Sequence, residues 1–159
     1  MYDLLSNNIE EFDNLLKQQP NITNSLRDGF YERTLLMKGA RKRDKPIVSL
    51  LSKNDHDLSV VNDNGRNVLH WIVLYNYDDD SFELLNLFDA TQLASVINQQ
   101  NKYNETPLHD AAWSNLHKTI VWLLEHGADP SVKDNGGERP GEQYRCNDET
   151  KRIIQFFRK

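Results

Sequence analysis

One stretch of the chain, residues 101–133, limits what the whole chain can fold into. It places Thr106-Pro107-Leu108-His109 before the pair Ala111-Ala112 and closes with Gly127. Threonine followed by proline is typical of a helix start, and glycine is the residue that most often follows a helix end. Paired alanines let two helices approach closely. The stretch therefore predicts two short helices packed against each other.

The same pattern returns along the chain at a period of about 33 residues. Pro140 stands one period after Pro107, and Thr34 stands one period before Asn67, which opens a similar Asn-Val-Leu-His string. A helix pair of this length cannot bury its own apolar face, so about three or more such units must stack on one another. The period predicts a stack that takes up almost the whole chain.

The complete unit at residues 101–133 resembles an ankyrin repeat. The resemblance implies an all-α ankyrin-repeat solenoid, in which helix-turn-helix units are joined by short β-hairpin loops within a single domain, residues 1–159. We expect about five units, of which the first and the last are degenerate caps. Their approximate bounds are residues 1–26, 27–61, 62–100, 101–133 and 134–159.

The third unit is longer than its neighbours. The spacing from Asn67 to Thr106 exceeds one period by about six positions. The extra residues lie either near Tyr77–Ser81 or near Asp89–Leu93, and the sequence leaves both positions open.

Charge and composition narrow the class of protein. The net charge of −5 argues against a dedicated nucleic-acid binder. The charge is unevenly distributed: the segment Arg27–Lys45 holds seven basic and three acidic residues, whereas the segment Tyr77–Asp89 holds five acidic residues and no basic one. No run approaches the roughly 18 apolar residues of a membrane helix, and no N-terminal segment has the charged start and apolar run expected of a secretory signal. A single cysteine, Cys146, excludes an internal disulfide. We expect a cytoplasmic protein without a membrane anchor. The string Arg41–Pro46 resembles a short nuclear import signal and leaves the nucleus as a second location.

No catalytic or metal site is predicted. The five histidines match no zinc spacing, and the chain has no nucleophile elbow, no phosphate-binding glycine loop and no Cys-x-x-Cys pair. His70 and His109 end the helix-opening motif, where the resemblance implies hydrogen bonds to the hairpin backbone and to the threonine hydroxyl. We expect no enzyme, no metal and no cofactor.

The resemblance implies a role in protein binding. Ankyrin repeats generally bind partners with the hairpin tips and the exposed side of the first helix, which together line a concave groove. Counting from Thr34, Asn67 and Thr106 places twelve candidate partner-binding residues on this groove. They are Phe30, Tyr31, Arg33, Lys38, Arg41, Lys42, Arg66, Trp71, Tyr75, Tyr103, Asp110 and Trp113.

Among these residues, Trp71 and Trp113 are the strongest candidates, because exposed aromatic and arginine side chains dominate protein interfaces. An inward position of Trp71 stays open, since a shift of one residue would place it in the core, as we expect for Trp122. The groove is predicted to be basic toward its N-terminal end and aromatic in its middle. The expected partner therefore presents acidic and apolar residues.

Two functions fit this pattern. The first is a non-catalytic adaptor or scaffold, monomeric on its own, that binds a partner protein through the groove. The alternative is a regulator that masks a partner's surface, similar to the short ankyrin proteins that inhibit cyclin-dependent kinases or NF-κB or that assist proteasome assembly, or to a host-directed effector. No motif in the chain selects between these two functions.

Overall fold

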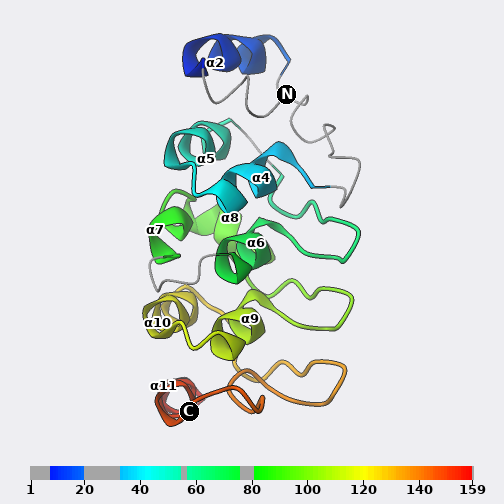
Figure 1. Cartoon of the computed structure of the whole chain (residues 1–159), viewed down its shortest axis with the longest axis vertical. Coiled ribbons are helices and arrows are strands. Elements are labelled where there is room, and N and C mark those ends of the chain that lie inside the picture. The colour runs from blue at the N-terminus through cyan, green and yellow to red at the C-terminus, as the bar shows by residue number, and fades with distance from the viewer. Residues whose placement is uncertain (1–7, 20–32, 55–56, 76–80, 159) are drawn as a thin grey trace.

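The structure is a computed structural model that describes residues 8–19, 33–54, 57–75 and 81–158. Within these ranges the helices stack along one axis in two columns, and the hairpin loops project to one side (Figure 1). The outer column holds α2 (Ile9–Gln18), α5 (Lys45–Ser52), α7 (Phe82–Leu85), α10 (His117–Glu125) and α11 (Asp148–Phe157). The inner column holds α4 (Leu35–Lys42), α6 (Val68–Leu74) and α9 (Pro107–Trp113), and α8 (Ala90–Val96) follows α7 in the chain. This stack confirms the predicted all-α solenoid.

The helices begin where the sequence supplies a side chain that can cap them. Thr34 Oγ1 accepts a hydrogen bond of 3.2 Å from the Met37 N–H at the start of α4. Asp44 Oδ1 accepts one of 3.2 Å from the Ile47 N–H at the start of α5. These oxygens satisfy N–H groups that have no partner inside the first helical turn, and each such cap contributes about 0.5–2 kcal/mol.

The core lies between the two columns of helices. Ala111 and Ala112 are fully buried, so α9 packs closely on its neighbours, as the paired alanines predict. Leu69 and Ile72 of α6 are also fully buried. Burial of a side chain of this size contributes about 1.5–3 kcal/mol. Apolar contacts between successive units therefore hold the stack together.

Two histidines, His70 and His109, each connect an inner helix to the hairpin of the next unit. His109 Nδ1 accepts the Thr106 N–H at 3.1 Å and lies 3.0 Å from the Thr106 hydroxyl, while Nε2 donates to the Glu138 carbonyl at 3.3 Å. His70 is fully buried, accepts the backbone N–H of the residue that caps α6 and donates through Nε2 to the Glu105 carbonyl at 3.1 Å. These bonds agree with the predicted contact of both imidazoles with the hairpin backbone. Only His109 also meets a threonine hydroxyl, because the residue that caps α6 is Asn67.

After its first helix, α6, the third unit carries two short helices, α7 and α8, where each neighbouring unit has a single second helix. The second of these, α8, begins at Asp89, whose Oδ1 accepts the Gln92 N–H at 2.8 Å. Leu93 and Val96 of α8 are buried in the core. The residues near Asp89–Leu93 therefore form a packed helix, whereas residues 77–80 lie outside the described residues.

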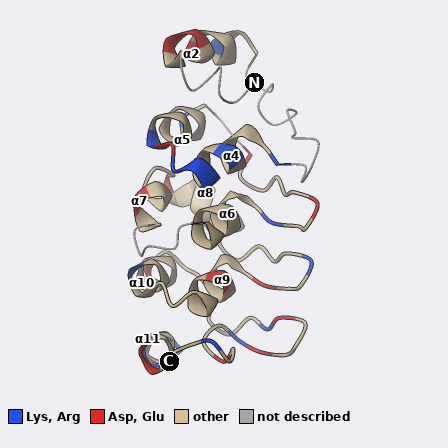
Figure 2. Ribbon diagram, in the orientation of Figure 1, with Lys and Arg blue, Asp and Glu red and all other residues tan. Residues whose placement is uncertain are grey.

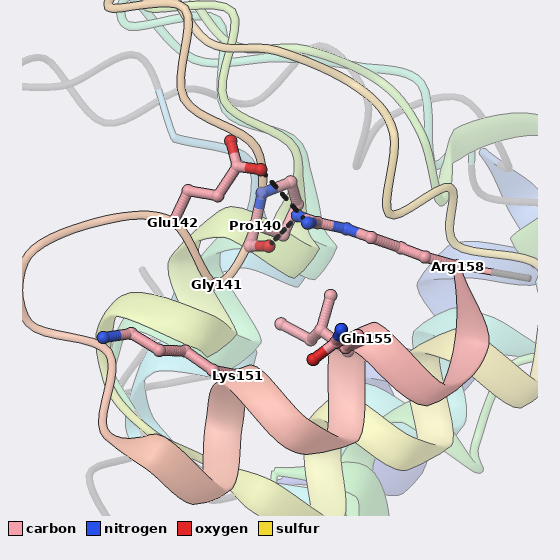
Figure 3. A pocket seen from close by; sticks show the side chains of 7 residues that line it. Pro140, Gly141, Glu142, Lys151, Gln155 and Arg158 are labelled. Atoms are coloured by element: carbon pink, nitrogen blue, oxygen red, sulfur yellow. Dashed lines mark hydrogen bonds and ion pairs between the residues drawn. The ribbon is translucent and has the colours of Figure 1, made fainter.

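Polar side chains gather at the C-terminal end of the described stack. Arg158, at the end of α11, donates to the Pro140 carbonyl at 2.8 Å and pairs with Glu142 at 3.1 Å (Figure 3). Lys151, Gln155 and Arg158 line a cleft of about 650 Å³ on this end.

The stability of the stack should depend on the protonation of His70. Burial lowers the pKa of His70 to about 4, although its hydrogen bond to the Glu105 carbonyl acts in the opposite direction. The unfolded chain takes up this proton near pH 6.5, before the folded chain does, so the free energy of unfolding falls as the pH drops from about 6.5 to about 4. We expect His70 to account for about 3 kcal/mol of this loss.

Urea unfolding at neutral and acidic pH, in wild type and in His70→Gln, measures this contribution. The variant should lose that part of the pH dependence, and His126→Gln, which changes an exposed histidine, should keep it. An unchanged pH dependence in His70→Gln would show that His70 is not held neutral by burial.

Candidate partner-binding groove

The inner helices α4, α6 and α9 share one side of the stack with the hairpin loops (Figure 1). Hydrogen bonds between neighbouring hairpins keep these loops aligned. The Lys102 N–H donates to the Asn64 carbonyl at 3.1 Å, and the Asn135 N–H donates to the Tyr103 carbonyl at 2.9 Å. Side chains from three successive units can therefore form one continuous surface, which we call the groove.

Four of the predicted residues form a stack of rings and guanidinium groups in the groove. Trp71 and Tyr75, four residues apart on α6, lie parallel with their ring centroids 4.7 Å apart. The Arg33 guanidinium lies 5.3 Å from the Trp71 ring, and the Arg41 guanidinium lies 5.4 Å from the Tyr75 ring. Each cation–π contact contributes about 0.5–1 kcal/mol at an exposed site and more where water is excluded.

This stack corrects the prediction that Trp71 is an exposed anchor. Its side chain is only 3% exposed. Positions four apart on a helix lie on the same face. Tyr75 therefore covers the indole, and Arg33 reaches it from the preceding unit. Counting from the helix start placed Trp71 on the right helix face but could not foresee these two neighbours.

A small cleft opens beside this stack. It measures about 200 Å³, and we call it the arginine cleft because three predicted arginines line it. Its walls are Arg33, Arg41, Asn62, Asn64, Arg66, Trp71, Leu74 and Tyr75. The structure thus brings five of the twelve predicted residues together at one place.

A second aromatic group lies farther along the groove. Trp113 is half-buried and meets Tyr144 edge to face, with ring centroids 4.9 Å apart, while the Arg145 guanidinium lies 5.2 Å from the Trp113 ring. Tyr103 is 53% exposed, with the Arg66 guanidinium 6.0 Å from its ring. Tyr144 and Arg145 are not among the twelve residues predicted for the groove. Their position one repeat period after the paired alanines, next to the predicted groove, was the signal that could have found them.

The remaining predicted residues divide into three groups. Lys42 is exposed and Lys38 is half-buried on α4, where Figure 2 shows basic residues gathering along α4 and at the start of α5. Asp110 is buried, so it does not form part of the exposed surface that the prediction required. Phe30 and Tyr31 lie outside the described residues.

Asp110 is an unusual group for a buried position. Burial raises the pKa of its carboxyl group well above the ordinary value, the Arg66 charge acts against this shift, and the Glu105 charge adds to it. Its Oδ2 atom has no hydrogen-bond partner in the part of the chain that the structure describes. Among the described residues, no three histidine, cysteine, aspartate or glutamate side chains are placed to hold a metal ion, so Asp110 is not part of a metal cluster there.

Comparison with known proteins identifies the family. The ankyrin repeat family model matches residues 103–135. The nuclear factor NF-kappa-B p105 subunit of Gallus gallus is 31% identical over 88 residues, which cover 55% of this chain and 9% of that relative. The p105 subunit of Rattus norvegicus is 31% identical over 91 residues, which cover 57% of this chain and 9% of that relative. The ADP-ribosylation factor GTPase-activating protein AGD4 of Arabidopsis thaliana is 30% identical over 127 residues, 77% of this chain and 15% of the relative.

The chain is an ankyrin-repeat protein. It matches no more than 15% of the length of these three relatives. Ankyrin repeats are protein–protein interaction modules and are typically not catalytic. In the described part of the chain, no helix is long and apolar enough to cross a bilayer.

Replacing Asp110 by asparagine should stabilise the protein at neutral pH. The folded chain keeps a proton on this carboxyl group at pH values where the unfolded chain has lost it, so the wild type loses stability as the pH rises above about 4. Asp110→Asn escapes this loss, so its stability relative to the wild type should rise steadily as the pH increases from about 4 to neutral.

Urea unfolding from acidic to neutral pH measures this difference between the variant and the wild type. Asp63→Asn, which changes an exposed aspartate at a hairpin tip, is the matched control and should follow the wild type. An Asp110→Asn variant that is less stable than the wild type at every pH would contradict the buried, neutral carboxyl group.

Proposed function

We propose that this chain is a non-catalytic adaptor or scaffold that binds a partner protein along the groove. The observation that supports this proposal is the gathering of arginine and aromatic side chains from three successive units on one side of the stack. The few residues that carry most of the binding energy in protein interfaces are enriched in arginine, tryptophan and tyrosine. A surface built from these residue types is suited to holding another protein.

The distribution of charge and exposure indicates what the partner presents. Arg41 and Lys42 are exposed at the end of α4, and Arg33 and Arg66 lie nearby at the arginine cleft. Farther along the groove, Tyr103 offers an exposed ring. We therefore propose a partner segment that carries acidic residues opposite α4 and apolar residues opposite Tyr103 and Trp113.

Affinity capture from a native lysate tests this function with a matched pair of variants. The groove variant is Arg41→Ala/Tyr103→Ala, and the control variant is Arg152→Ala/Phe156→Ala, which removes an exposed cation and an exposed ring from α11. Neither variant touches the core. We expect at least a tenfold loss of one partner's affinity in the groove variant, because hot-spot residues contribute about 2 kcal/mol or more and about 1.4 kcal/mol is a factor of ten.

The control variant should keep the partner, and both variants should melt at the wild-type temperature. Equal recovery of every partner by the wild type and the groove variant would contradict binding through the groove. Addition of the purified chain to the captured partner then separates an adaptor, which leaves the partner's activity unchanged, from a regulator, which suppresses it.

A further inference from the structure

We propose that the arginine cleft is a carboxylate-binding subsite that takes one aspartate or glutamate side chain of the partner. This inference rests on the proposed function, since it assigns a specific task to one part of the groove. It differs from general charge attraction because it names the place, the donors and the group that binds.

The size of the cleft suits a single side chain. Small-molecule and cofactor pockets usually enclose about 300–1,000 Å³, whereas the arginine cleft measures about 200 Å³. Its walls come from two units, with Arg33 and Arg41 from one and Arg66, Trp71 and Tyr75 from the next. A side chain that enters here would contact both units at once.

Two hydrogen-bond donors at the cleft have no acceptor among the described residues. They are Nε of Arg66 and Nε1 of Trp71, both shielded from solvent. Buried polar groups in folded proteins are nearly always paired, because an unpaired one costs about 1–3 kcal/mol. In contrast, Nε1 of Trp122 donates to Asn86 Oδ1 at 2.6 Å. The two unpaired N–H groups at the cleft match the two acceptor oxygens of a carboxylate.

The charge at the cleft also favours an anion. No carboxylate among the described residues pairs with Arg41, whose guanidinium lies against the Tyr75 ring. Arg66 meets Glu105 through Nη2 at 3.6 Å, which leaves its Nε unused. Asp110 is another acidic group near Arg66. Burial raises the pKa of its carboxyl group, so it opposes an incoming carboxylate only weakly. Three arginines and no acidic residue line the cleft, and this lining favours an anion.

The indole N–H signals of the protein provide a direct test. The chain has three tryptophans, so a nitrogen–proton NMR spectrum of the full chain shows three indole signals. The probes are the capped tripeptide Gly-Glu-Gly, the same peptide with glutamine, and the same peptide with phosphoserine. We expect the glutamate peptide to shift the Trp71 signal in a saturable way, the glutamine peptide to bind at least tenfold more weakly, and the Trp122 signal to stay in place.

Two variants with the same change of charge show whether the cleft is responsible. Arg41→Gln removes an exposed cation at the cleft, and Arg152→Gln removes an exposed cation on α11. We expect Arg41→Gln to weaken binding of the glutamate peptide about threefold to tenfold, and Arg152→Gln to leave it unchanged. Circular dichroism should show the same helix content in both.

Several results would overturn the proposal. They are a Trp71 signal that does not move, an equal response to the glutamine peptide, tighter binding of the phosphoserine peptide, or an Arg41→Gln variant that binds like the wild type. Because no partner is needed, this test is separate from the capture experiment. If the groove variant loses its partner but the glutamate peptide does not shift the Trp71 signal, the groove still binds the partner and only the carboxylate subsite is refuted.

Discussion

The bonds from His70 and His109 to the next hairpin are the constraint on which the rest of the structure depends. Each imidazole holds the start of its own inner helix and donates to a carbonyl of the following unit. The third, fourth and fifth units are thereby fixed in one register, while apolar side chains such as Leu69 and Leu108 are fully buried in the core. Because the units share one orientation, equivalent helix positions meet on one side and form the groove.

Most buried polar side-chain atoms of the described residues have a hydrogen-bond partner, and several of the exceptions lie on the groove side of the stack. Arg66 Nε, Trp71 Nε1 and Asp110 Oδ2 have no hydrogen-bond partner among the described residues, and all three belong to residues that the sequence placed on the groove. A folded protein tolerates such a cost most readily where a ligand will offset it. The same residues lie near exposed aromatic rings, so this poorly satisfied region of the described stack is also a suitable surface for binding.

The repeat pattern predicted the fold because each of its parts has a local physical role. Thr34 and Asp44 cap helices, the paired alanines at 111 and 112 permit close packing, and the histidines bind the hairpins. The groove was predicted only in outline. Whether a ring such as Trp71 is exposed depends on which side chains reach it from the neighbouring unit, and Arg33 belongs to the unit before it. The burial of Asp110 and the contact between Trp113 and Tyr144 depend on packing between units in the same way.

The central claim is that the inner helices and the hairpins bind the partner, and hydrogen exchange tests it most directly. Amide exchange measured by mass spectrometry, with the chain free and bound to its captured partner, reports which segments become protected. We expect added protection in residues 33–43, 62–75 and 101–113, and little change in α10 and α11. Protection confined to the outer helices α5, α10 and α11, with the inner segments unchanged, would contradict the account.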